Sequence, residues 1–239
     1  MSQILHRKDL SNLLNEKELK LFSKLQEIIK DLNKISNLTR LIEEDDYWIS
    51  QVYDSIWPFL DNKKRTFDKK KLIDIGSGCG FPGLAFAITH PNSEIYLIDS
   101  SEKKTNALKK IINEMNLPNN ISIVRDRIET FAHIPKYRNY FDIGTTRAVS
   151  EPSTVAEYIL PMLNNQGLGI LFCGKWGEEA RQKLEKSLTI LNGKIFLSKK
   201  TKLPQNKGER NAIFIKPTKL CPNTYPRGNG KPAKYPLGI

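Results

Sequence analysis

The sequence predicts an α/β protein with a mostly parallel, seven-stranded sheet, helices on both faces of the sheet and an N-terminal helical cap. Three observations support this fold class. Short apolar runs alternate with helical patterns between residues 71 and 216, a glycine-rich turn follows the first run, and two apolar-striped helices precede it. Ligands of such sheets bind at the carboxyl edge of the strands, so a functional site is expected there.

Two amphipathic helices are expected in residues 1–70, the predicted cap. Apolar residues recur at spacings of three, four and seven from Asp9 to Asn33, a pattern compatible with one break. A second stripe runs from Glu43 to Leu60 and ends near the turn at Pro58. We expect both helices to pack on the sheet, on a face that the sequence does not specify.

Residues 71–216 form the predicted sheet domain, and residues 217–239 a basic tail rich in Pro and Gly. Strands are expected near Lys71–Ile75, Ile95–Asp99, Ile121–Val124, Phe141–Thr146, Leu168–Cys173, Lys194–Lys199 and Ala212–Ile215. Helices are expected near Pro82–Thr89, Lys103–Asn116, Ser153–Leu163 and Glu178–Leu191. Five prolines and three glycines in the tail argue against regular structure, and a disordered end is the plain interpretation.

The composition is that of a globular protein with a large positive charge. Of 239 residues, 39% are hydrophobic and 27% charged, and 38 Lys and Arg against 26 Asp and Glu leave a net charge of +12. This surplus favours a polyanionic partner such as nucleic acid. A single basic run is more often a solvated face, so the evidence for a nucleic-acid partner comes from all the basic runs together. The runs are Lys63–Arg65, Lys69–Lys71, Lys103 with Lys104, Lys109 with Lys110, and Lys199, Lys200 and Lys202.

No apolar run is long enough to span a bilayer, and the first residues lack the apolar stretch of a signal peptide. We therefore expect a cytoplasmic protein with no membrane partner, and a monomer. Cys79, Cys173 and Cys221 are odd in number and share no metal-ligand spacing. Reduced thiols and no bound metal are expected.

The stretch from Lys71 to Gly83, KLIDIGSGCGFPG, reads as a buried strand that ends in a tight glycine loop. Its glycines permit positive φ and close approach of backbone N–H groups to a ligand. A dinucleotide-binding turn requires a third glycine at the position that Phe81 occupies in this chain, so the loop departs from the dinucleotide-binding pattern. Asp99 ends the second strand 23 residues after Gly76, where an acid binds a ribose in such folds. A nucleoside ligand is expected, and a turn without a ligand is the alternative.

The glycine loop and the strand-end acid together resemble the class I S-adenosylmethionine-dependent methyltransferases, which have a Rossmann-like fold. The resemblance implies S-adenosyl-L-methionine as cofactor. It also directs attention to the carboxylate after the third strand, in the run from Asp126 to Glu129, as a partner for the adenine. A surface ion pair is the alternative for that run.

Basic residues follow three later strands. Arg147 closes the fourth strand, Lys175 follows the fifth and Arg210 enters the last. Burying an arginine at the end of an apolar strand costs free energy without a partner, which favours a functional role for Arg147.

The chain lacks residues that other methyl transfers need. Enzymes that methylate exocyclic amines usually end the fourth strand with Asn or Asp, Pro-Pro and an aromatic residue, where this chain has Thr146, Arg147 and Ala148. A pyrimidine C5 enzyme needs a cysteine nucleophile. Cys173 remains a candidate for that role, although a structural thiol is the better interpretation.

Guanine N7 already carries an acceptor lone pair, so methyl transfer to it requires no general base. Positioning the base is then the main task of the protein.

Further motifs resemble one family, the small-subunit (16S) ribosomal RNA guanine-N7 methyltransferases, historically called glucose-inhibited division protein B. The matching runs are NLT at 37–39, DSI at 54–56, DIGSGCGFPG at 74–83, R-x-E at 127–129, TRA at 146–148, GK at 174–175, GER at 208–210 and the ending YPRGNGKPAKYPL. The resemblance implies methylation of one guanosine N7 in 16S ribosomal RNA, as naked RNA or in the small subunit.

The resemblance also implies site residues. Cofactor contacts are implied at Gly76, Gly78, Phe81, Asp99, Ser100, Ser101, Ile128, Glu129 and Arg147. Catalytic or RNA contacts are implied at Arg127, Arg147, Lys175 and Arg210. The chain departs from the family twice, with Ser50 and Gln51 in place of the common Arg-His and with Asn211 in place of a common His. A nicotinamide-dependent reductase and an RNA-binding assembly factor without turnover remain the rival functions.

Overall fold

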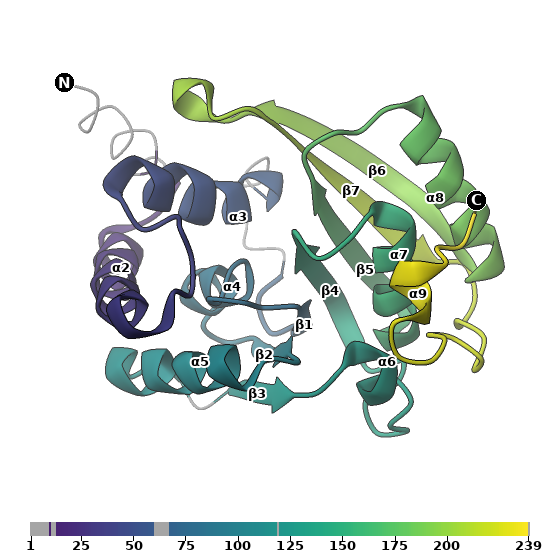
Figure 1. The fold of residues 1–239 in the computed structure, drawn as a ribbon, viewed down its shortest axis with the longest axis horizontal. Coiled ribbons are helices and arrows are strands. Elements are labelled where there is room, and N and C mark those ends of the chain that lie inside the picture. The colour runs from purple at the N-terminus through teal and green to yellow at the C-terminus, as the bar shows by residue number, and fades with distance from the viewer. Residues whose placement is uncertain (1–9, 11–12, 60–66, 119, 239) are drawn as a thin grey trace.

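The structure is a computed structural model that describes residues 10, 13–59, 67–118 and 120–238 (Figure 1). The basic run Lys63–Arg65 lies outside the described residues, as do Asp9 and Leu60, the predicted outer limits of the cap helices. Among the helices that are described, none is both long and apolar enough to cross a membrane.

One seven-stranded sheet forms the centre of the molecule, in the order β3-β2-β1-β4-β5-β7-β6. The first five strands are parallel, and β7 runs antiparallel to both of its neighbours. The predicted mostly parallel, seven-stranded sheet is therefore confirmed. The strands are β1 (Lys71–Ile75), β2 (Glu94–Asp99), β3 (Ile121–Arg125), β4 (Phe141–Arg147), β5 (Leu163–Cys173), β6 (Gly193–Lys202) and β7 (Glu209–Pro217).

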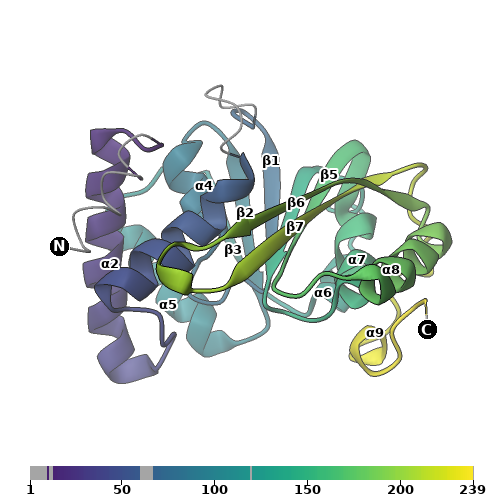
Figure 2. The ribbon, with the colours of Figure 1, turned by 90° about the horizontal axis from the view of Figure 1, so that it is seen from above.

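Side chains that alternate along the strands divide the core into two halves. Leu72, Ile95 and Leu97 point to one face, and Ile73 and Ile98 point to the other. The first face is covered by α4 (Gly83–Thr89) and α5 (Glu102–Met115). The second is covered by α6 (Ile128–Phe131), α7 (Pro152–Ile159) and α8 (Glu178–Ile190). Figures 1 and 2 show these helices on opposite sides of the sheet.

The N-terminal region lies on the α4–α5 side. Helix α2 (Glu16–Ser36) begins with a capping box between Asn15 and Glu18 and packs its apolar stripe against α4 and α5, so it adds a layer outside the helices of that face. The second predicted helix is divided into a π-helix (Asp46–Tyr53), α3 (Asp54–Ile56) and a 3-10 turn (Trp57–Phe59). Such π-helical segments often mark functional positions, and this one faces the site described below.

The structure extends three predicted strands and corrects the prediction for the tail. Strand β5 begins at Leu163 rather than Leu168, and β6 and β7 are longer at both ends, because their outer residues are polar and show no apolar alternation. The expected absence of regular structure in the tail is wrong. Helix α9 (Lys231–Lys234) forms there and packs against α7, while Cys221, Pro226 and Pro232 are buried.

Candidate functional site

A cleft of about 440 Å³ opens at the carboxyl edge of the sheet, at the switch point between β1 and β4 where the strand order reverses. Eight of the nine predicted cofactor residues line it. These are Gly76, Gly78, Phe81, Asp99, Ser100, Ile128, Glu129 and Arg147, and the predicted RNA-contacting Arg127 lines it as well.

The glycine loop forms one wall of the cleft. Gly76 and Gly78 have φ of +73° and +58°, values that favour glycine. The N–H groups of Gly76 and Ser77 both donate to the carbonyl of Ile98, at 2.8 and 3.0 Å, which ties the loop to the end of β2. A Cβ at Gly76 would lie 2.5 Å from Cγ2 of Val149 across the cleft, so a side chain would narrow the cleft as well as strain the loop.

Asp74 holds the loop from beneath. Its Oδ2 accepts from the N–H of Gly83 at 3.0 Å and its Oδ1 accepts from the hydroxyl of Thr145 at 3.0 Å, so it joins β1, the start of α4 and β4. The side chain is fully buried, and this burial raises the pKa of Asp74 to about 6. Asp74 therefore acts on the cleft through the loop that it supports.

Asp99 lies at the end of β2, as predicted. Its Oδ2 accepts from the N–H of Gly78 at 3.0 Å and its Oδ1 accepts from the N–H of Ser101 at 2.9 Å, with Nζ of Lys104 3.6 Å from Oδ2. A carboxylate has about four acceptor sites, so lone pairs remain for the hydroxyls of a ribose. Ser101 caps α5 by accepting from the N–H of Lys104 at 3.4 Å, and lies outside the residues that line the cleft.

Glu129, in the short helix α6 that follows β3, is buried with 4% of its surface exposed. Its Oε1 accepts from the N–H of Gly230 at 3.0 Å and from the hydroxyl of Tyr158 at 3.4 Å. Burial and the nearby Glu129 raise the pKa of Tyr158 to about 12, which keeps its phenol a donor. Because Glu129 is buried at the cleft, the alternative of a surface ion pair fails for this residue. Arg127 beside it is exposed.

Arg147 ends β4 at the rim of the cleft and is held by the π-helix of the cap. Its Nη1 donates to the carbonyl of Ser50 at 2.8 Å and lies 3.4 Å from Oδ2 of Asp54, and its Nη2 donates to Oε1 of Gln51. The guanidinium lies 5.8 Å from the ring centroid of Phe81. Asp54 supplies the charge partner that a nearly buried arginine requires.

The other predicted basic residues lie farther out on the same edge. Arg210 Nε is 3.3 Å from the same Oδ2 of Asp54, so Arg147 and Arg210 meet at one carboxylate. Lys175 is exposed after β5. Neither Arg210 nor Lys175 is among the residues that line the cleft.

Both departures from the family pattern lie in buried hydrogen-bonded positions. Gln51 donates to the hydroxyl of Thr39 at 3.2 Å and to Sγ of Cys79 at 3.5 Å, so it connects Arg147 with the glycine loop. Asn211 donates to the carbonyl of Gly174 at 2.6 Å and holds the end of β5 next to Lys175.

Sequence reasoning missed several residues that line the cleft. Leu38 and Thr39 follow α2, Ala148 and Val149 follow β4, and Tyr158 lies on α7. The NLT run at 37–39 was a usable signal, whereas Tyr158 lies on an apolar helical stripe that looks like core. Cys173 lines a smaller cavity beside β5, and burial raises its pKa to about 11, which opposes a role as thiolate nucleophile.

Comparison with protein families and relatives gives one consistent result. The family model described as rRNA small subunit methyltransferase G matches residues 18–210. The protein named Ribosomal RNA small subunit methyltransferase G in Prochlorococcus marinus strain MIT 9312 is 60% identical over 230 residues, covering 96% of this chain and 97% of the relative. The protein of the same name in strain NATL2A is 46% identical over 224 residues, covering 94% and 90%.

Solved structures share the fold at low sequence identity. A 16S rRNA (adenine(1408)-N(1))-methyltransferase from Catenulisporales acidiphilia has a TM-score of 0.52 at 13% identity, covering 65% of this chain and 88% of that one. A mutant of MtNAS has a TM-score of 0.51 at 14% identity, covering 92% and 76%. At this identity the likeness concerns the fold alone, and it confirms the predicted class I methyltransferase architecture.

Proposed function

This chain belongs to the rRNA small subunit methyltransferase G family, and we propose that it transfers a methyl group from S-adenosyl-L-methionine to N7 of one guanosine in 16S ribosomal RNA. The observation that carries the proposal is the convergence of the glycine loop, Asp99, Glu129 and Arg147 on one cleft. The first three suit a nucleoside, and the fourth stands at the rim where a second substrate would approach.

The residues of the cleft fit S-adenosylmethionine. Its volume of about 440 Å³ falls in the range of small-molecule sites. Asp99 offers free lone pairs at the position of a ribose, and Glu129 offers a buried carboxylate beside the apolar Ile128 for an adenine. Bound there, the cofactor supplies an electrophilic methyl group on a sulfonium.

The chemistry assigned to the protein is positioning. Guanine N7 brings its own lone pair, so no side chain has to remove a proton for the methyl transfer. The guanidinium of Arg147 is held in one orientation by its contacts with Ser50, Gln51 and Asp54. A guanidinium fixed in this way can orient an RNA group at the mouth of the cleft. Arg127, Lys175 and Arg210 would hold phosphates around it.

The β6–β7 hairpin extends this basic surface. Residues 193–217 contain seven Lys and Arg and one Glu, so this segment contributes +6 of the net +12. The carboxyl end of β6 lies at the cleft side because β6 runs parallel to β5. Figure 2 shows the hairpin crossing above the cap helices, to which it is tied by Lys207, 2.7 Å from Oδ1 of Asp46. An RNA substrate would therefore meet a positive arm beside the methyl-transfer site.

The test is methyl transfer from radiolabelled S-adenosylmethionine to naked 16S RNA and to assembled small subunits, followed by mass mapping of the modified nucleotide. We expect one 7-methylguanosine. Cofactor binding without transfer to either substrate would favour an assembly factor, and binding of NAD in place of S-adenosylmethionine would favour a reductase. A ribosomal substrate would place the protein in the cytoplasm, and the monomer expected from the sequence stays a prediction.

A further inference from the structure

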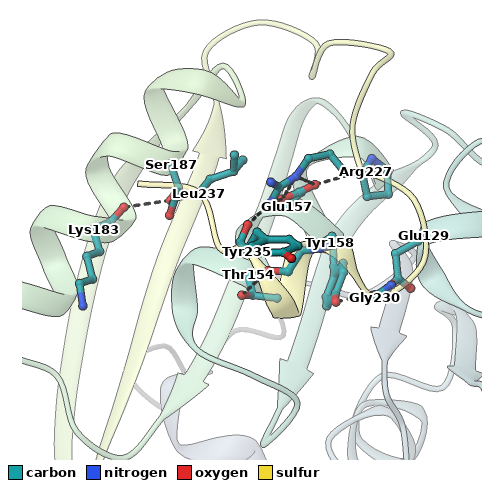
Figure 3. Close-up of polar contacts among 12 residues, drawn as sticks. Glu129, Thr154, Glu157, Tyr158, Lys183, Ser187, Arg227, Gly230, Tyr235 and Leu237 are labelled. Atoms are coloured by element: carbon teal, nitrogen blue, oxygen red, sulfur yellow. Dashed lines mark hydrogen bonds and ion pairs between the residues drawn. The ribbon is translucent and has the colours of Figure 1, made fainter. Parts of the chain in front are cut away.

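The C-terminal segment makes contacts that the proposed function does not use. Residues 225–237, here called the strap, cross the outside of α7 and α8 and contain the YPR-x-x-G-x-P run (Figure 3). Between its two ends the strap passes α6, the short helix that carries Glu129. The contacts that anchor the strap are separate from its contact with Glu129 at the cleft. The role of the Glu129 contact can therefore be tested by itself.

Arg227 is the main anchor of the strap. Its guanidinium grips the carboxylate of Glu157 on α7, with Nε 2.9 Å from Oε1 and Nη2 2.7 Å from Oε2, and its own N–H donates to Oε1 at 2.7 Å. Glu157 is fully buried. Nη2 of Arg227 also donates to the carbonyl of Tyr235 at 2.7 Å, which closes the strap into a loop around α9. A buried, bidentate pair of this kind fixes both position and orientation.

Two side chains beyond β3 hold the entry to the strap. Arg138 donates from Nη1 to the carbonyl of Tyr225 at 2.8 Å and from Nη2 to that of Pro222 at 2.9 Å. Nε2 of His133 lies 2.9 Å from the carbonyl of Pro226. The backbone just before Arg227 is therefore constrained ahead of the point where the strap reaches Gly230.

Gly230 delivers the contact with the cleft. Its φ of +77° turns the N–H toward Glu129, whose Oε1 it meets at 3.0 Å, and Asn229 next to it accepts from the hydroxyl of Thr130 at 3.2 Å. A Cβ at Gly230 would meet no atom within 4 Å. Glycine is thus needed there for its conformation and not for space.

We propose that the strap is a positioning element for the cofactor. By donating the Gly230 N–H to one oxygen of Glu129, it fixes the carboxylate so that the other oxygen faces the cleft, and Arg227 is the residue that holds the strap in place. Arg227 and Gly230 lie outside the residues that line the cleft, so they act through Glu129. This inference rests on the proposed function, because it takes the ligand of the cleft to be S-adenosylmethionine.

Arg227→Gln combined with Glu157→Gln tests the proposal, since the pair of changes removes both charges and leaves no buried carboxylate unpaired. We expect the Kd for S-adenosylmethionine, measured by calorimetry, to rise roughly tenfold, as for one lost bond to a charged acceptor. The matched control is Ser187→Ala, which removes the 2.7 Å bond to the carbonyl of Leu237 at the far end of the strap. The control should stay within about twofold of the wild type.

Two further measurements separate positioning from general stability. In a Glu129→Gln background the double change should have little additional effect on the Kd, because the acceptor that the strap orients is already altered. In cofactor-free protein, backbone amides 128–131 should exchange faster in the double variant than in the wild type. If the double variant does not fold, Gly230→Ala serves instead, because its strain displaces the N–H while the Arg227–Glu157 pair stays intact.

The outcomes are distinguishable. A wild-type protein that binds no S-adenosylmethionine contradicts the proposed function, whatever the variants do. A wild-type protein that binds it, with folded strap variants of unchanged affinity and unchanged amide exchange, contradicts the strap alone. If the double change lowered the affinity for S-adenosylmethionine equally with and without Glu129→Gln, the proposed role of the strap would also be contradicted.

Discussion

Arg147 is held by three groups of the cap at once, and this sets how much change its position tolerates. Its donors reach the carbonyl of Ser50, the amide of Gln51 and the carboxylate of Asp54. The planar guanidinium of an arginine holds its donors in fixed directions, whereas the three donors of a lysine ammonium rotate about a single nitrogen. A lysine would keep the charge and lose this orientation.

We therefore predict that Arg147→Lys and Arg147→Ala both lower the single-turnover rate of methyl transfer, by about 100-fold or more, at saturating cofactor. Circular dichroism should show a folded protein, because Arg210 stays beside Asp54 and limits the cost of an unpaired carboxylate. Lys175→Ala, at an exposed residue, should lose less. Near-normal turnover in Arg147→Ala would contradict the positioning mechanism and require a side chain that acts as base or nucleophile.

Asp74 gives a residue-scale prediction about pH. A carboxyl whose pKa rises from 3.8 in the unfolded chain to about 6 in the fold contributes stability that is fully present below the lower value and is lost as pH rises through the higher one. The difference corresponds to roughly 3 kcal/mol. Near neutral pH, the fold is therefore less stable with Asp74 ionised than it would be with Asp74 protonated.

Asp74→Asn removes this titration and can keep both bonds. Its oxygen can accept from Gly83, and its amide can donate to the hydroxyl of Thr145, which then donates to the carbonyl of Ile73, 3.5 Å away. Urea unfolding at pH 4 and pH 7 should show the free energy of unfolding of the variant rising relative to that of the wild type by roughly 2 kcal/mol over that interval. A difference that does not change with pH would contradict the raised pKa.

At the scale of elements, the sequence was most informative where a motif marks the end of a strand. The glycine loop and Asp99 were predictable because apolar runs locate β1 and β2, and parallel strands bring their carboxyl ends together. Tyr158 was not predictable, because it comes from a helix whose stripe is that of any core helix. The grip of Arg227 on Glu157 was hidden for a different reason, since it joins positions 70 residues apart that show no local pattern.

The same limit applies to the β6–β7 hairpin. Both strands were expected, yet their length and direction came only from the structure. Lys200 and Lys202 are exposed at the cleft end of β6, whereas Lys194 and Lys216 pair at the opposite end of the hairpin. The chain thus offers two lysine pairs that match in charge and differ in distance from the site.

We predict that Lys200→Gln with Lys202→Gln weakens RNA binding, whereas Lys194→Gln with Lys216→Gln, the matched control, does not. Removing two phosphate contacts should reduce the slope of log affinity against log salt by roughly 1.4 to 1.8. Filter binding to 16S RNA at several salt concentrations measures both slopes. Equal effects of the two pairs would mean that the positive charge acts at long range and that the hairpin forms no defined RNA contact.

For the whole molecule, the net charge of +12 and the shape of the cleft predict different salt responses for the two ligands. RNA would meet exposed basic groups, with Lys175, Lys200 and Lys202 as the proposed contacts, and binding to such groups releases counterions. The cofactor would meet buried carboxylates and backbone donors, which salt screens much less.

Raising the salt from 50 to 200 mM should therefore weaken RNA binding by a factor on the order of 1,000, if six or more phosphates are contacted, and change cofactor affinity by less than about threefold. Calorimetry with S-adenosylmethionine and filter binding with 16S RNA, in the same buffers, give the two slopes. A flat response for RNA would remove the basic surface as the RNA-binding footprint. A steep response for the cofactor would mean that its carboxylate binds exposed charges such as Arg127, and that the buried contacts of Asp99 and Glu129 do not dominate its affinity.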